Sequence, residues 1–216
     1  MPRDSLIPPH GGYKKLRTYK LGNLIYDATA AFCEQYLDRK DRTYDQMVQA
    51  ARSGVANIIE GSEASATSKK SELKLTNVAK ASHEELLTDY QAFLRQRGLP
   101  EWSAESPAAT TVRRARPDTL DQLRELMAAL VADPVRLPEI PPRDGRTEFA
   151  QDAGAVRNKA ARKAEVAGNV MLCLINQETY LLGRQIARLA ADFEREGGFT
   201  ERLHRIRTEI RKKGKS

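Results

Sequence analysis

Few residues in this chain have the types and the spacing that a metal site requires. The chain contains three histidines, His10, His83 and His204, and two cysteines, Cys33 and Cys173. These side chains are far apart in the sequence and form no set with the spacing of metal ligands or of a disulfide framework. We therefore expect no metal, no disulfide and no cofactor.

Two segments come near to catalytic motifs, and each lacks an essential part. The sequence HEEL at His83–Leu86 lacks the second histidine of the HExxH zinc motif. The sequence EGSEASATSKKS at 60–71 lacks the GK[ST] of a phosphate-binding loop and does not follow a strand. Glu84, Glu85 and Asp89 crowd one predicted helix, as is typical of a solvated face. We therefore expect no catalytic residue and predict that the protein is not an enzyme.

Basic side chains are the stronger chemical signal, because lysine and arginine bind phosphate and displace its counterions. The candidate phosphate contacts are Lys14, Lys15, Arg17, Lys20, Lys69, Lys70, Lys74, Arg202, Arg205, Arg207, Arg211, Lys212 and Lys213. Few aromatic residues are interleaved among them, so base stacking on a single-strand platform is not indicated. This pattern favours binding of nucleic acid, RNA before DNA, with little sequence specificity. A basic solvated face without a ligand remains the alternative.

The overall composition is that of a globular chain with an excess of positive charge. The 216 residues carry a formal net charge of +7, and the last 16 contribute seven basic and two acidic side chains. Aromatic residues make up only 6% of the chain, which favours a helical core of Leu, Ile, Val and Ala. No apolar run approaches the roughly 20 residues of a membrane span, and the N-terminus lacks the apolar centre of a secretory signal. We expect a cytoplasmic protein without a membrane partner.

Three amphipathic helices are predicted within residues 13–98, because apolar residues recur there every three or four positions. The three stripes are Leu21, Ile25, Ala28, Phe32 and Tyr36; Tyr44, Met47, Ala51, Val55 and Ile58; and Leu73, Thr76, Ala79, His83, Leu86, Tyr90 and Phe93. Thr43 and Gln46 have capping-box spacing and predict the start of the second helix, which we expect to stop near Gly61. Thr67 or Ser68 is the expected N-cap of the third helix.

The chain changes character after residue 98. Seven of the ten prolines lie between Pro100 and Pro142, which excludes a continuous helix there. We predict that residues 99–152 form a Pro-rich insertion with one short helix, which begins at the capping-box pair Thr119 and Gln122. A fourth long helix is expected at 153–197, with Val170, Leu174, Leu181, Ile186, Leu189 and Phe193 on its apolar side. Residues 198–216 are predicted to be a short basic helix, and residues 1–12 a flexible N-terminus.

These elements predict an all-α fold. Four long amphipathic helices must cover one another's apolar stripes, and an up-down four-helix bundle is the simplest arrangement that does so. In that bundle the Pro-rich insertion is the crossover between the third and fourth helices.

The second predicted helix has an unusual polar face. Opposite the apolar stripe lie short or uncharged side chains such as Gln49, Ser53 and Asn57, and Thr43–Ser68 contains one basic residue, Arg52. A solvated face is usually rich in Lys, Arg and Glu, so this face is a candidate contact surface, although a plain exposed face remains the alternative. Gly54 lies inside the helix despite its low helix propensity, which suggests close approach of a neighbouring backbone.

The same helix carries a family resemblance. The sequences ARSGVANIIEGSEA (51–64) and LTNVAKASHEEL (75–86) resemble the motif of a bacterial four-helix-bundle family, on Arg52, Ser53, Asn57, Ile58, Glu60, Gly61, Ala79, Ser82, Glu85 and Leu86. That family includes proteins encoded in 23S rRNA intervening sequences and accessory variability proteins of diversity-generating retroelements. Segments such as LRQRGLPEW (94–102) and the tail from 172 to 207 resemble the subgroup with a C-terminal four-helix-bundle suffix. Two residues depart from the pattern: Ala81 replaces a frequent glycine, and His83 stands at a position that is often apolar.

The resemblance implies an up-down bundle that assembles as a ring-like homo-oligomer, typically a pentamer. In the retroelement members it also implies a basic surface for nucleic acid and a reverse transcriptase. The oligomer or structural motif residues would be Arg52, Ser53, Asn57, Glu60, Gly61, Ser82 and Glu85.

Two functional hypotheses follow from the sequence. The first is a non-enzymatic oligomeric scaffold that binds nucleic acid, RNA favoured, either with a reverse transcriptase or in an rRNA-associated setting. The second is a protein adaptor or assembly module whose basic tail binds an acidic protein and no nucleic acid.

Overall fold

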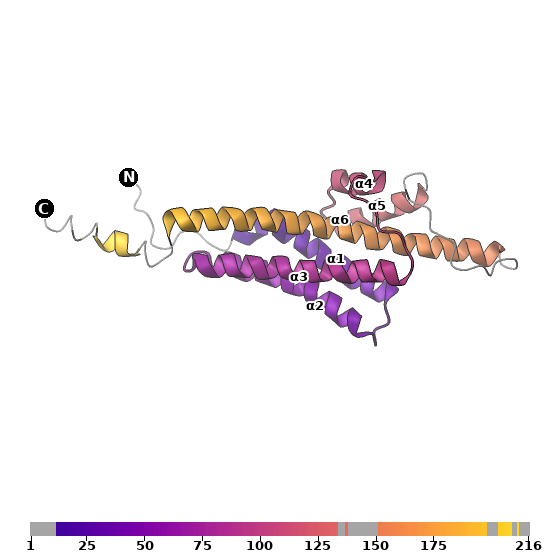
Figure 1. Ribbon diagram of the computed structural model, residues 1–216, viewed down its shortest axis with the longest axis horizontal. Helices are drawn as coiled ribbons and strands as arrows, with labels where there is room; N and C mark the ends of the chain where they lie inside the picture. The colour runs from indigo at the N-terminus through magenta and orange to yellow at the C-terminus, as the bar shows by residue number, and fades with distance from the viewer. Residues whose placement is uncertain (1–11, 134–136, 138–150, 198–202, 209–210, 212–216) are drawn as a thin grey trace.

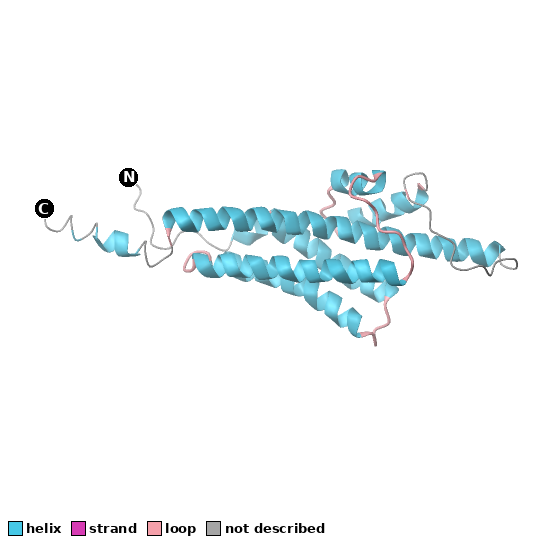
Figure 2. Cartoon of the chain, in the orientation of Figure 1, coloured by secondary structure: helices cyan, strands magenta, loops and turns pink. Residues whose placement is uncertain are grey.

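The chain is all-helical in the part that its computed structural model describes, which comprises residues 12–133, 137, 151–197, 203–208 and 211 (Figure 2). A short 3₁₀ turn, η1 (Gly12–Lys15), precedes the first helix. The helices are α1 (Arg17–Tyr36), α2 (Arg42–Ala64), α3 (Lys69–Gln96), α4 (Pro107–Ala115), α5 (Leu120–Ala132) and α6 (Gln151–Glu196). Residues 203–208 are also helical.

Side-chain caps set the start of several helices, and one differs from the prediction. Asp41, not Thr43, caps α2, because its carboxylate accepts a hydrogen bond from the Thr43 backbone N–H. Ser68, and not Thr67, caps α3 by accepting from the N–H of Ser71. Thr119 caps α5 by accepting from the N–H of Gln122, as predicted.

The predicted stop of the second helix near Gly61 is wrong, because α2 continues to Ala64. Gly61 is buried against α3, where an added Cβ would lie 3.4 Å from the Cβ of Leu75 and 3.5 Å from the Glu72 carbonyl oxygen. Gly61 therefore lies inside the helix, where an added Cβ would make ordinary van der Waals contact with α3, and its residue type does not mark the helix end.

The four long helices α1, α2, α3 and α6 lie side by side, as Figure 1 shows. α2 packs against α1 and α3, and α6 packs against α3 and α1. The Tyr90 hydroxyl of α3 donates to Thr29 of α1 at 3.1 Å, and Arg97 after α3 donates to the carbonyl of Tyr36 at the end of α1. At the other end, Thr18 of α1 donates to Gln185 of α6 at 3.1 Å.

The predicted apolar stripes form the core. Leu21, Ile25, Ala28 and Phe32 are buried in α1, and Phe32 stacks edge-on against Tyr90 and Phe93 of α3. On α6 only the first part of the predicted stripe is buried: Val170 and Leu174 are buried, and Leu182 is fully buried where Leu181 was predicted. The remaining predicted positions, Leu181, Ile186, Leu189 and Phe193, are only partly buried. Leu182, Ile58 and Ala79 form a small cluster with Leu16 and Tyr19 at the end of the bundle where α1 begins.

The segment after α3 contains two helices rather than the single one predicted. α4 begins with Ser106 as N-cap and Pro107 in the first turn, a position that tolerates proline because its N–H would have no helical partner. Both α4 and α5 pack against α6. The predicted segments 1–12 and 198–216 fall largely outside the described residues, as do 138–150 within the insertion.

A buried polar contact holds the start of this segment on α6. The side-chain oxygen of Asn169 accepts from the backbone N–H of Trp102 at 2.7 Å, and its amide donates to the Pro100 carbonyl at 2.9 Å. The Trp102 indole N–H donates to Glu165, which also pairs with Arg162. Because every partner is satisfied, this network can lie in the interior without a large free-energy penalty.

Among the described helices, none combines the length and the apolar character that crossing a membrane would require.

Candidate functional site

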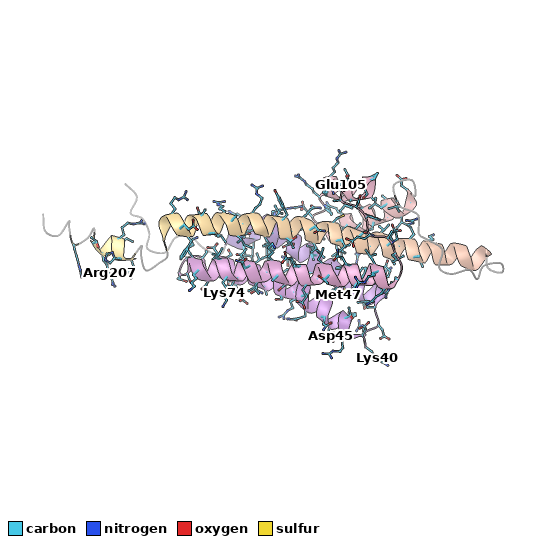
Figure 3. The ribbon with its side chains drawn as sticks, viewed as in Figure 1. Lys40, Asp45, Met47, Lys74, Glu105 and Arg207 are labelled. Carbon is cyan, nitrogen blue, oxygen red and sulfur yellow. The ribbon has the colours of Figure 1, made fainter. Side chains whose placement is uncertain are left out.

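Basic side chains from separate parts of the sequence gather at one end of the bundle. η1 and the first turns of α1 carry Lys14, Lys15 and Lys20, and all three are exposed. The start of α3 lies at the same end, because α2 leads into it directly and the Leu16–Tyr19 turn packs on Ile58 and Ala79. Figure 3 shows Lys74 toward this end and Lys40 toward the other.

The predicted phosphate contacts in this region differ in whether an acidic side chain already pairs with them. Lys70 and Lys74 are exposed. Lys69 pairs with Glu72 at 3.0 Å, and Arg17 forms an ion pair with Asp118 of the α4–α5 connection. Lys14, Lys15, Lys20, Lys70 and Lys74 therefore keep more of their charge available for a ligand than Arg17 and Lys69 do.

The tail supplies further predicted contacts. Arg205, Arg207 and Arg211 are exposed, whereas Arg202, Lys212 and Lys213 lie outside the described residues. Figure 3 shows Arg207 beyond the end of α6, on the same side as Lys74.

The structure adds two arginines that the sequence analysis did not single out. Arg184 and Arg188 lie on the exposed face of α6, near the end where α1 begins. Arg188 contacts Asp192 at 3.8 Å, and Asp192 also accepts from Arg195. The sequence does contain a signal for these two residues: they are four positions apart and lie opposite Leu182. This spacing places both side chains on one solvent-exposed row of the helix.

The motif residues on α2 and α3 meet in the seam between these helices. The hydroxyls of Ser53 and Ser82 are hydrogen-bonded at 3.1 Å, and the Asn57 amide donates to the Ser53 carbonyl at 2.8 Å and to its hydroxyl at 3.2 Å. Gly61 and Ala79 are buried nearby. Small side chains allow the two helices to approach closely here, so these positions hold α2 on α3 within one chain.

The charged motif residues point outward from that seam. Arg52, Glu60 and Glu85 are exposed. Glu85 also lines a surface groove of about 390 Å³, together with Asp45, Gln46, Gln49, Ala50, Ser53 and Ser82. One part of the polar face of α2 is thus covered by α3, and another part is exposed to solvent.

A buried pair of ionisable side chains lies in the middle of the bundle. His83 of α3 and Glu178 of α6 are both fully buried, and Nδ1 of His83 lies 3.6 Å from Oε1 of Glu178. That separation exceeds hydrogen-bond length. Neither ring nitrogen and neither carboxyl oxygen makes a hydrogen bond within the described residues.

Burial shifts the pKa values of the two groups in opposite directions. It lowers the pKa of His83 to about 4, which the nearby Ala51 carbonyl opposes. It raises the pKa of Glu178 well above the usual value, against the effect of Arg17. Because burial disfavours the charged form of each group, the favoured state is a neutral imidazole beside a protonated carboxyl group, so the titratable proton of the pair is on Glu178.

Glycines on the two facing helices make room for this pair. A Cβ at Gly54 of α2 would lie 2.0 Å from Nε2 of His83, and a Cβ at Gly22 of α1 would lie 2.9 Å from Oε1 of Glu178. The close approach that the sequence suggested for Gly54 is therefore present, but the approaching group is the His83 imidazole rather than a backbone. Each of the four long helices thus contributes one residue to the surroundings of the buried pair or to the pair itself.

The thiols lie in surroundings that suppress their reactivity. Burial, helped by the charge of Asp89, raises the pKa of Cys33 to about 12. Burial raises the pKa of Cys173 to about 11, while Arg113 acts in the opposite direction. A thiol is nucleophilic only as the thiolate, so neither cysteine is poised for catalysis at neutral pH. Within the described residues, no three His, Cys, Asp or Glu side chains come together as metal ligands.

Comparison with known proteins yields no relative: no protein-family model, no curated protein and no solved structure matches this chain.

Proposed function

We propose that this chain is a non-enzymatic scaffold that binds RNA through the basic end of an up-down four-helix bundle. The segment from 99 to 150 would be the crossover of that bundle. The single observation that carries the proposal is the gathering of cationic side chains from η1, α1, α3 and α6 at one end. Such a cluster raises the local concentration of a polyanion and releases its counterions on contact.

A second feature of this end supports phosphate binding. Lys70 lies in the first turn of α3, where backbone N–H groups without helical partners also favour an anion, and Lys74 follows one turn later. Because both of these features act on phosphate charge and not on base edges, we expect contacts to the RNA backbone and weak sequence preference.

The binding experiment is a salt titration of RNA affinity with a neutralised variant. Lys70→Gln, Lys74→Gln and Arg184→Gln remove three exposed charges at the basic end. If all three contact phosphate, the slope of log K against log salt should become shallower by about two, since each contact to a single strand contributes about 0.7.

A matched control removes three exposed charges elsewhere. Lys40→Gln, Arg42→Gln and Arg95→Gln all lie toward the opposite end, near the start of α2 and the end of α3. This control should keep the slope of the unmodified chain. RNA affinity that is absent, or equal losses in both triple variants, would refute a localised RNA site, and binding of an acidic protein without RNA would favour the adaptor hypothesis.

We also propose that the chain assembles as a ring-like homo-oligomer, with a pentamer expected from the family resemblance and a reverse transcriptase as a candidate partner. The exposed part of the α2 face supports this, because Glu85 lines the groove at Ser53 and Ser82, and Glu60 is exposed further along α2. Glu60→Arg with Glu85→Arg should lower the mass measured by sedimentation. Asn57 is a poor test position, because its amide already bonds within α2. An unchanged mass, or a monomeric unmodified chain, would refute this interface.

A further inference from the structure

A second candidate site lies far from the basic end, between α1, α5 and α6. It is a groove of about 470 Å³, within the range of small-molecule sites. Alanines form much of its wall: Ala28 and Ala31 on α1, Ala128 on α5 and Ala167 on α6. The groove stays open because these four positions carry methyl groups where longer side chains would fill it.

The interior of the groove is apolar and adaptable. Leu123 and Met127 of α5 face Phe32 of α1 and Met171 of α6. Methionine side chains adjust to irregular apolar shapes because they are unbranched and polarisable. Of the described residues that line the groove, Gln35 and Tyr36 are the uncharged ones with a polar side-chain group.

Among the residues that the structure describes, three cationic side chains and no acidic ones line the same groove. Lys159 and Lys163 are exposed and lie one helical turn apart on α6, and the described residues provide no ion pair for either. Arg124 of α5 pairs with Asp121, which does not line the groove. The two lysines therefore present a positive charge beside an apolar cavity.

We propose that this groove binds a free long-chain fatty carboxylate. Its alkyl chain would lie along the alanines and methionines, and its carboxylate would contact Lys159 and Lys163. A peptide fits this lining less well, because its buried N–H and C=O groups would find few partners, whereas an alkyl chain needs none. The inference is independent of RNA binding, since the lysines involved are not those of the basic end.

The first test measures binding of hexadecanoate to the full chain by isothermal titration, with hexadecanol as the uncharged probe. We expect saturable binding of one hexadecanoate per chain and an affinity for the alcohol about tenfold weaker, from loss of the two exposed ion contacts. Absence of saturable binding, or equal affinity for acid and alcohol, would overturn the proposal.

Variants locate the site. Ala128→Phe places a ring in the groove and should abolish binding, whereas Ala129→Phe, also exposed on α5 but outside the lining, should leave it unchanged. Lys159→Gln with Lys163→Gln should reduce the affinity for the acid to that for the alcohol and should keep RNA affinity. Lys70→Gln with Lys74→Gln should do the reverse. If Ala129→Phe weakens binding as much as Ala128→Phe, the ligand is not in this groove.

Discussion

Replacing Gly54 by alanine should destabilise the protein through one identifiable contact. An added Cβ would lie 2.0 Å from Nε2 and 2.3 Å from Cδ2 of His83. The imidazole is fully buried among four helices and has no solvent to move into. The clash must therefore be relieved by a shift of α2 against α3.

The magnitude follows from two opposing contributions. Alanine has a helix propensity about 1 kcal/mol more favourable than glycine. Overpacking of a well-packed interior costs about 1 to 3 kcal/mol, and an overlap of this depth belongs at or beyond the upper end. We expect Gly54→Ala to lower the free energy of unfolding by about 2 kcal/mol.

The sign should reverse when the imidazole is absent. His83→Ala by itself should lower the free energy of unfolding by about 2 to 4 kcal/mol, because it leaves a cavity and removes the neighbour of Glu178. In that background the methyl group of Gly54→Ala enters vacated space and should raise the free energy of unfolding by about 1 kcal/mol. The coupling between the two positions is then about 3 kcal/mol.

The assay is urea unfolding of the two single variants, the double variant and the unmodified chain at one protomer concentration. Gly183→Ala is the matched control, because its Cβ would meet only Lys80 Cε at 3.8 Å, and it should be neutral or stabilising. If Gly54→Ala destabilises equally with and without His83, the contact described here is not the reason for the glycine.

Three further outcomes follow from the structure. The raised pKa of Glu178 contributes stability that is present at low pH and is lost as pH rises toward its folded pKa, while the lowered pKa of His83 opposes this only up to about pH 6.5. Above pH 6.5 the free energy of unfolding of the unmodified chain, measured with urea, should fall by up to about 1.4 kcal/mol per pH unit relative to that of Glu178→Gln. Parallel pH profiles of the two free energies would contradict the buried pair. Asn169→Ala should lower the free energy of unfolding by about 2 kcal/mol, because it leaves the buried Trp102 N–H without an acceptor, whereas exposed Asn176→Ala should change it by less than about 0.5 kcal/mol. The fluorescence of Trp102, the only tryptophan, can be used to follow unfolding. Equal losses of stability in Asn169→Ala and Asn176→Ala would exclude a role for the hydrogen bond between Asn169 and the Trp102 backbone. Both thiols should react with a disulfide reagent far more slowly in the native chain than in urea, and fast native labelling of Cys33 would show that its burial is transient.

The helices could be predicted from the sequence because their apolar residues follow the 3.6-residue period, as the buried stripe from Thr76 to Phe93 shows. The helix α4 was missed because prolines dominated that segment, although Ser106 and Pro107 together form a recognisable helix start. Helix ends were less predictable, since Gly61 has the residue type of a stop but lies inside α2, which continues to Ala64.

The candidate sites were only partly predictable. The lysines at 14, 15, 69, 70 and 74 were identified by type, but only the packing of Leu16 and Tyr19 onto α2 and α3 shows that they share one end. His83 and Glu178 are 95 positions apart, and no periodic pattern links such residues. Their pairing depends on how far α6 is displaced along α3, which the sequence of either helix alone does not determine.

The fit between Gly54 and the His83 ring also limits which combinations of residues this sequence can reach over time. A lineage that replaces the histidine by a small residue can then exchange the glycine freely, and each later side chain at 54 would make return of the imidazole harder. A lineage that begins at the glycine keeps the clash with the imidazole until position 83 also changes. Descendants that carry a side chain at 54 should therefore have lost the imidazole at 83, whereas loss of the histidine alone leaves the glycine in place.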